Sequence, residues 1–265
     1  MCYHLCMNRF DNENDRERFS RTRALLGEEA MQTLAASRVA VFGLGGVGGH
    51  CAEALARSGV GALDLVDGDF VALSNCNRQV FATDKTVGMR KAEAAKERIA
   101  LLSPRCRVTA HDVFFLPENA DSLDFSAFDY VVDAIDTVSG KLALVMQARA
   151  AGVPVICSMG AGNKLDPTRF EVADLYETSV CPLARVMRAE CRKRGIDHLK
   201  VVYSKEPPMA PRPEEAMTAG TPDSSPARPG APKKRAPGSN AFVPSAAGLI
   251  IAGQVVCDLT GCRND

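Results

Sequence analysis

The chain has 265 residues, enough to bury a substantial core, and its 32 basic side chains balance its 32 acidic ones. The balance excludes recruitment of nucleic acid by overall charge, so any such contact must come from a local basic patch. None of the ten cysteines forms a C-x-x-C pair, which argues against a structural zinc site.

The N-terminal part is expected to be a tail followed by a helix. Residues 1–17 are polar and predict a flexible tail without an apolar stretch of signal-peptide length, so we expect a cytoplasmic protein with reduced thiols. Residues 18–34 have helical patterning and begin a folded domain that is expected to extend to residue 206. The side chains expected in its core are Phe19, Leu25, Leu26, Met31 and Leu34.

A glycine-rich turn follows the apolar run 39–42. Gly43, Gly45 and Gly48 form the pattern G-x-G-x-x-G, and Gly46 lies within it. Gly43 permits the tight turn, Gly45 lets backbone approach a phosphate, and Gly48 lets the next helix pack closely on the strand. The start of that helix offers unpaired N–H groups to an anion, so the turn predicts a nucleotide site without specifying the nucleotide.

Polar side chains follow the next apolar run, residues 63–66. Asp67 ends this run about twenty residues past the glycines, where a carboxylate can accept a hydrogen bond from a ribose hydroxyl. The loop that follows is too polar for a buried connection, with Asn75, Asn77, Arg78 and Gln79. Lys91 opens the next helix, where the helix dipole does not favour a cation, and a bound polyphosphate would explain its position.

Three further apolar runs, 107–113, 128–135 and 155–158, predict strands separated by helical stretches. This alternation predicts an α/β fold with a doubly wound, mainly parallel sheet. Asp136 comes directly after the run 128–135, so it is expected to face the same crevice as the glycine turn. A carboxylate beside triphosphate oxygens can bind magnesium, although the same position also suits a helix N-cap.

The second half of the chain predicts an amphipathic helix over 182–194 and an apolar helix near its end. The amphipathic helix contains most of a local density of basic residues, which comprises Arg185, Arg188, Arg192, Lys193, Arg194, Lys200 and Lys205. This density indicates either a solvated helix face or a patch for a phosphate backbone.

Residues 207–238, rich in Pro, Ala, Ser and Gly, predict a disordered insert. Residues 239–265 predict a C-terminal segment whose helix completes the domain or a dimer interface, too interrupted by polar residues to span a membrane.

The combination of motifs resembles the E1-like (ThiF) adenylating superfamily. The motifs are G-L-G-G-V-G, V-D-G-D, S-N-C-N-R-Q, T-V-G-M-R-K and D-A-I-D. The resemblance implies a Rossmann-like adenylation fold in which Asp67 binds ribose, Arg78 and Lys91 bind the triphosphate, and Asp136 binds Mg²⁺. Arg21 resembles the arginine that reaches the nucleotide across a homodimer interface in this superfamily.

Within the superfamily, the second half of the chain is most similar to the tRNA threonylcarbamoyladenosine dehydratase branch. The motifs are S-M-G-A-G-N-K-L-D-P-T-R at 158–169, C-P-L-A-R-V-M-R at 181–188, V-V-Y-S-K-E at 201–206 and G-S-N-A-F-V-P-S-A-A-G-L at 238–249. The resemblance implies that ATP activates the threonyl carboxylate of the modified adenosine at tRNA position 37, and that the carbamoyl group then closes a ring. It leaves open a monovalent alkali cation at the 160–169 turn and a sulfur-transfer partner such as a cysteine desulfurase.

Three other functions remain open on the residues. An enzyme that activates a ubiquitin-like or sulfur-carrier protein would use Cys181 as its acyl acceptor. A nicotinamide dehydrogenase would use the same glycines and Asp67, but Arg78 and Lys91 are positioned for a triphosphate that a dinucleotide lacks. A tRNA-binding scaffold without activity would not need the complete set of nucleotide-site residues.

Overall fold

The computed structural model describes residues 13–210 and 237–262. Its α-helices are α1 (Glu13–Arg18), α2 (Ser20–Leu26), α3 (Glu28–Ala36), α4 (Gly48–Ser58), α5 (Lys91–Leu102), α6 (Val138–Ala150), α7 (Pro182–Lys193) and α8 (Val243–Thr260). Its strands are β1 (Arg38–Phe42), β2 (Ala62–Val66), β3 (Arg107–His111), β4 (Tyr130–Asp133), β5 (Val155–Ser158), β6 (Phe170–Asp174) and β7 (Lys200–Ser204).

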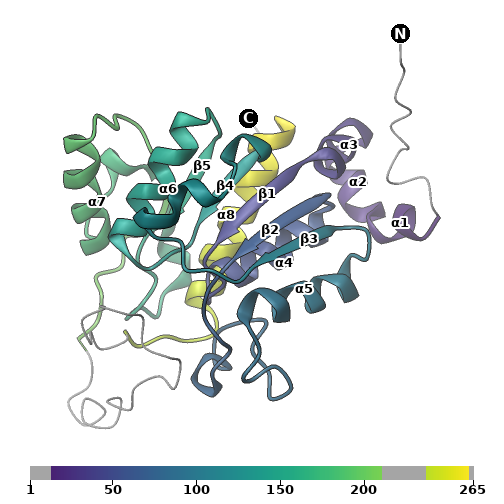
Figure 1. Cartoon of the computed structure of the whole chain (residues 1–265), viewed down its shortest axis with the longest axis horizontal. Coiled ribbons are helices and arrows are strands. Elements are labelled where there is room, and N and C mark those ends of the chain that lie inside the picture. Colours follow the sequence, from purple (N-terminus) through teal and green to yellow (C-terminus); the bar gives the residue numbers. More distant parts are fainter. Residues whose placement is uncertain (1–12, 211–236, 263–265) are drawn as a thin grey trace.

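These strands form one sheet in the order β3-β2-β1-β4-β5-β7-β6 (Figure 1). Neighbouring strands are parallel except β6, which runs antiparallel to β7. Successive residues of β1 point to opposite faces: Val39 and Val41 join the apolar cluster that contains α4 and α8, whereas Ala40 and Phe42 join the cluster that contains α6. Helices cover both faces, so the doubly wound, mainly parallel α/β fold is confirmed.

The strand order reverses between β1 and β4. The chain passes outward from β1 to β2 and β3 and then returns to pair β4 with the other side of β1. In such sheets the crevice beyond the carboxyl ends of the two strands at the reversal receives the ligand. The glycine turn follows β1 and Asp136 follows β4, so the topology brings the two predicted parts of the site to one crevice.

Helix α8 packs on the glycine turn and on α4. A Cβ atom on Gly248 would lie 2.3 Å from the carbonyl oxygen of Val47, and one on Gly46 would lie 3.0 Å from Cβ of Pro244. The helix is long and apolar enough to cross a membrane by length and composition, but one of its faces is buried against α4 and the sheet. This packing accounts for the apolar sequence of α8.

The N-terminal prediction was wrong in three respects. The expected helix over 18–34 is broken at Gly27, which adopts a φ of 83° between α2 and α3. Leu25 is 83% exposed and does not enter the core. Residues 13–17 of the expected tail belong to α1, where the buried carboxylate of Asp15 lies 2.8 Å from Arg105. Residues 1–12 lie outside the described residues, as does most of the expected insert, 211–236.

Candidate active site

The glycines of the turn have different environments. Gly43 has a φ of 86°, and a Cβ atom on it would lie 2.6 Å from the carbonyl oxygen of Ala134. A Cβ atom on Gly48 would lie only 1.8 Å from the carbonyl oxygen of Gly43, so neither position accepts a side chain without movement of the backbone. No described atom lies within 4 Å of the corresponding position at Gly45. The backbone at Gly45 is therefore open to a ligand.

Asp67 fastens the glycine turn to the end of β2. One carboxylate oxygen accepts a hydrogen bond from the N–H of Leu44 at 2.6 Å, and the other accepts one from Asp69 at 2.8 Å. Burial raises the pKa of the Asp67 carboxyl, although Lys91 and the two N–H donors oppose the shift. A carboxylate has further lone pairs, so these contacts are compatible with the predicted bond to ribose, which stays a prediction.

Lys91, the first residue of α5, is 8% exposed, and its Nζ lies 3.0 Å from a carboxylate oxygen of Asp69. The helix dipole disfavours a cation at the start of a helix, and this ion pair accounts for Lys91 there without requiring a bound nucleotide. Asp69, the second acidic residue of the V-D-G-D motif, was not among the predicted site residues. The sequence signal that could have identified Asp69 is its position two residues after Asp67.

The loop after β2 holds Arg78 in a fixed place. Its guanidinium donates to the carbonyl oxygen of Ser74 at 2.8 Å and to Oδ1 of Asn77 at 2.9 Å. Asn77 in turn donates to the carbonyl oxygen of Ser239, just before α8. The loop therefore connects Arg78, which is predicted to bind the triphosphate, to the G-S-N-A motif.

The same loop is more buried than its polarity predicts. Asn75 is 2% exposed and Gln79 is 8% exposed, so the expectation that these residues are too polar for a buried connection was wrong. The side-chain oxygen of Asn75 accepts the N–H of Ala72 at 3.1 Å, which explains how an amide can be buried there. In the described structure Asn75 shapes the loop, and its predicted contact with the nucleotide stays a prediction.

Asp136 lies exposed in the loop between β4 and α6. The N-cap of α6 is Thr137, so the alternative interpretation of Asp136 as an N-cap was wrong. Residues 13–210 and 237–262 hold no group of three or more His, Cys, Asp or Glu residues that could enclose a metal ion. One accessible carboxylate suits Mg²⁺, which proteins commonly bind through one or two carboxylates together with substrate phosphates.

The 158–169 motif forms a turn held from several sides. Asn163, with a φ of 58°, donates its N–H to the carbonyl oxygen of Gly238 at 2.8 Å and accepts the N–H of Met209 at 2.8 Å. Lys164 is 4% exposed and its Nζ donates to the carbonyl oxygen of Glu206. Burial lowers the pKa of this ammonium. The motif thus joins the two flanks of the expected insert to the end of the sheet.

Cys181 is buried at the N-cap of α7, with 2% of its surface exposed. A carrier protein could not reach a thiol buried to this extent without movement of the residues around it. The small side chain fits a structural role at this helix start.

The predicted basic density divides into separate groups. Arg185 and Arg192 are exposed on α7, while Arg188 donates to the carbonyl oxygen of Thr178 at 2.8 Å. The remaining cations have acidic partners: Lys193 and Arg194 pair with Glu190, Lys205 with Glu171, and Lys200 with Asp258. The density is therefore smaller than the sequence predicts and is centred on α7.

Arg21 is exposed on α2 and does not lie at the glycine turn of its own chain. The guanidinium of Arg18 donates to the carbonyl oxygen of Leu102 at 2.5 Å, and α3 leads into the amino end of β1. These features hold the N-terminal helices near the amino ends of the strands, whereas the glycine turn follows a carboxyl end.

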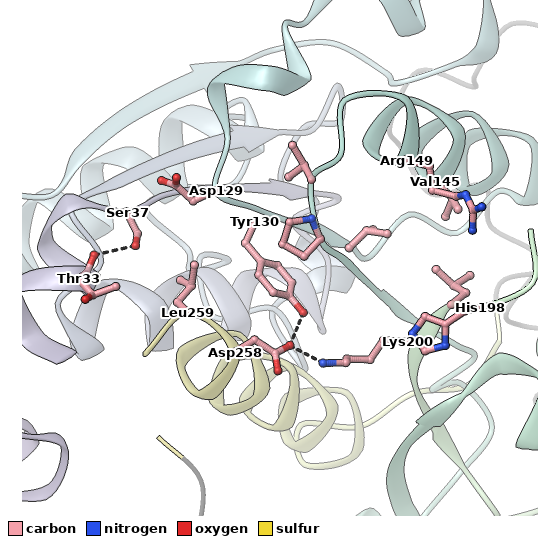
Figure 2. Close-up of a pocket in the computed structure, with 14 residues that line it drawn as sticks. Thr33, Ser37, Asp129, Tyr130, Val145, Arg149, His198, Lys200, Asp258 and Leu259 are labelled. Atoms are coloured by element: carbon pink, nitrogen blue, oxygen red, sulfur yellow. Dashed lines mark hydrogen bonds and ion pairs between the residues drawn. The ribbon is translucent and has the colours of Figure 1, made fainter. Parts of the chain in front are cut away.

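A cavity of about 660 Å³ lies at the amino ends of β4, β5 and β7 (Figure 2). Inside it, Asp258 accepts hydrogen bonds from Tyr130 at 2.6 Å and from Lys200 at 2.5 Å. These polar groups satisfy one another, and the cavity is at the opposite edge of the sheet from the glycine turn. It is not the nucleotide crevice.

Comparisons with known proteins agree with this fold. The ThiF family pattern matches residues 19–265. The tRNA threonylcarbamoyladenosine dehydratase of Bacillus subtilis is 44% identical over 242 residues, which cover 91% of this chain and 94% of that protein. The crystal structure of the Escherichia coli tRNA N6-threonylcarbamoyladenosine dehydratase with ATP has a TM-score of 0.80 at 33% identity and covers 94% of this chain and 96% of that chain. The AMP complex of the same enzyme has a TM-score of 0.82, also at 33% identity, and covers 94% of this chain and 97% of that chain. The chain therefore belongs to the ThiF family, and within it to the tRNA threonylcarbamoyladenosine dehydratases.

Proposed function

We propose that this protein uses ATP to dehydrate N6-threonylcarbamoyladenosine at position 37 of tRNA, giving the cyclic form of the base. The observation that supports the proposal is the crevice: the glycine turn follows β1 and Asp136 follows β4, where the strand order reverses. The carbonyl oxygen of Arg78 lies 3.4 Å from a Cβ atom placed on Gly46, and Lys91 pairs with Asp69, which follows β2. A relative with 44% identity over nearly the full length of both chains bears the name of this activity.

The chemistry divides into two steps. The threonyl carboxylate attacks the α-phosphorus of ATP, which forms an acyl-adenylate and releases pyrophosphate. A nitrogen or oxygen of the neighbouring carbamoyl group then attacks the acyl carbon, closes a five-membered ring and releases AMP. Because the attack is intramolecular, its proximity replaces a protein nucleophile.

The residues of this chain have distinct parts in that chemistry. Lys91 and Arg78 stabilise the negative charge that shifts onto the departing pyrophosphate. The N–H groups at Gly45 and at the start of α4 bind phosphate oxygens. Asp136 would hold Mg²⁺, which would neutralise phosphate charge when bound. An alkali cation at the 160–169 turn and a cysteine desulfurase partner stay predictions, and neither takes part in the bonds made and broken in the two steps.

A homodimer belongs to the same proposal. Arg21 is exposed and away from its own glycine turn, so it can contribute to a nucleotide site only in a second copy. Leu25 on α2 and Leu249 on α8 expose apolar surface, at 83% and 55%, that a subunit interface would cover. These features support a dimeric enzyme, and the tRNA substrate supports a cytoplasmic location.

The direct test incubates the protein with ATP, Mg²⁺ and tRNA that carries the modified base, followed by mass spectrometry of the nucleosides. The expected product has lost one water, and AMP and pyrophosphate appear in equal amounts. If NAD stabilised the protein against heat while ATP with Mg²⁺ did not, the dehydrogenase alternative would replace this proposal. Acylation of a carrier protein with no change in the tRNA base would support the carrier-activating alternative.

Replacing Cys181 with Ala is expected to leave kcat for cyclisation unchanged, because no thiol takes part in either step. Loss of the buried sulfur should lower the free energy of unfolding by about 1 kcal/mol. Steady-state kinetics and urea unfolding measure the two effects separately. A folded Cys181→Ala protein without activity would show that the mechanism does use the thiol.

The exposed arginines of α7 are expected to bind the tRNA backbone. The double substitution Arg185→Glu and Arg192→Glu should weaken tRNA binding and reduce the slope of log affinity against log salt by roughly 0.7–0.9 for each lost phosphate contact. Arg188 is left intact because its bond to Thr178 supports the fold. The matched control replaces both residues with Lys. An unchanged salt slope in the charge-reversed protein would remove α7 from the tRNA interface.

A further inference from the structure

A fully buried ion pair lies directly beneath the crevice. Asp133, the last residue of β4, and Lys141 in α6 are both 0% exposed, and Nζ of Lys141 lies 3.1 Å from a carboxylate oxygen of Asp133. Neither residue has a part in the proposed chemistry. Removing two charges from water is costly, and a pair of apolar residues could fill the same space. The pair therefore needs an explanation beyond stability.

The hydrogen bonds of the pair reach two loops of the crevice. Asp133 uses its other oxygen to accept the N–H of Ile135 at 3.0 Å, which fixes the start of the loop between β4 and α6. Lys141 also donates to the carbonyl oxygen of Ser158 at 2.7 Å, where β5 enters the 158–169 motif. One buried pair thus connects the ends of two adjacent parallel strands.

The first of these loops supports the glycine turn. The N–H of Ala134 donates to the carbonyl oxygen of Phe42 at 2.8 Å, and the carbonyl oxygen of Ala134 occupies the space that a side chain on Gly43 would need. Asp136 lies two residues farther along the same loop. A shift of this loop would therefore move Asp136 and alter the support of the glycine turn together.

We propose that Asp133 and Lys141 are positioning residues, which hold the β4–α6 loop and the start of the 158–169 motif in the geometry that adenylation requires. The inference rests on the proposed function. The pair does not touch the reacting atoms; it acts through Asp136 and through the loop backbone. Misplacement of reacting groups by about 1 Å can cost about 10²-fold in rate, so small movements suffice for a large effect.

The test compares the double variant Asp133→Asn with Lys141→Met against wild type. Each single substitution leaves an unpaired buried charge and is expected to destabilise the fold strongly, whereas the double variant removes both charges. The amide that replaces the carboxylate of Asp133 can still accept the N–H of Ile135, but the thioether that replaces the ammonium of Lys141 cannot donate to Ser158. We expect the double variant to fold, with kcat for AMP release lowered about tenfold or more and KM for ATP changed less than about threefold.

Hydrogen exchange of the ligand-free proteins gives a readout that is independent of activity. Amides of residues 134–137 and 158–160 should exchange faster in the double variant, while those of α4 should not. The matched control is the double variant Arg38→Met with Asp64→Asn. It removes another ion pair with a buried carboxylate, in which Nε of Arg38 lies 2.7 Å from a carboxylate oxygen of Asp64. This pair lies away from the crevice. The control variant should have lower thermal stability while kcat and exchange in both loops stay at wild-type values.

A double variant with wild-type kcat and wild-type exchange in both loops would overturn the inference and leave the pair a purely structural role. Failure of the proposed function would look different, because the wild-type protein would then form no AMP with modified tRNA. The exchange measurement would still report whether the pair positions the two loops.

Discussion

Replacing Lys91 with Met is expected to lower the rate of AMP release by about 10²- to 10³-fold, the usual cost of losing one preorganised donor to a developing negative charge. Met keeps most of the volume of the side chain, so the start of α5 should stay folded. The loss also leaves Asp69, now 3.0 Å from the ammonium, without this cation, so that its negative charge would repel a triphosphate bound nearby. The affinity for ATP should therefore fall together with kcat.

The control for this substitution is Lys96→Met on the same helix. Lys96 is exposed on α5, and its Nζ lies 3.9 Å from a carboxylate oxygen of Glu93. Its replacement should leave both kcat and the affinity for ATP unchanged. Steady-state release of pyrophosphate and calorimetric titration with ATP measure the two quantities. Equal activities of the two variants would show that Lys91 does not act on the phosphates.

Two glycine substitutions in one turn are expected to fail for different reasons. Gly48→Ala forces a Cβ atom to within 1.8 Å of the Gly43 carbonyl oxygen, so the turn must shift and the free energy of unfolding should fall by about 3 kcal/mol. Gly45→Ala meets no described atom within 4 Å and should change the stability by less than about 0.5 kcal/mol. Its added methyl group should instead obstruct a phosphate and lower the affinity for ATP about tenfold.

Urea unfolding and calorimetric titration with ATP separate the two outcomes. The expected pattern is a destabilised Gly48→Ala protein and a stable Gly45→Ala protein that binds ATP weakly. If Gly45→Ala bound ATP as tightly as wild type, the phosphates would not approach the turn at Gly45. The two variants thus distinguish a glycine required by the fold from one required by the ligand.

Three strands, β1, β2 and β5, could be predicted closely because each is a short apolar run that is almost entirely buried and ends near glycine or a polar residue. β1, β2 and β5 lie within a residue of their expected ranges. The N-terminal helix could not be predicted correctly, since Gly27 is compatible with a continuous helix until its φ is known. The burial of Asp15 depends on Arg105, a partner that local patterning does not reveal.

Sequence motifs likewise point to some residues of the candidate site but not to others. The glycines, Asp67, Arg78, Lys91 and Asp136 could be proposed from the sequence because they occur in short motifs with a chemical rationale. Their supporting partners could not, because each joins segments that are distant in the chain. Lys141 is an example: it is one charged residue in an otherwise apolar stretch of helix, and only the sheet topology brings it to Asp133 and Ser158.

The packing of α8 on the glycine turn has a consequence for folding of the chain during its synthesis. All seven described strands are synthesised before α8, yet Pro244 and Gly248 lie against Gly46 and Val47 at the turn. A nascent chain that stalls before α8 has therefore made every predicted nucleotide ligand but not the surface that supports the turn. We therefore expect ATP binding only after α8 has been made and has packed on the turn.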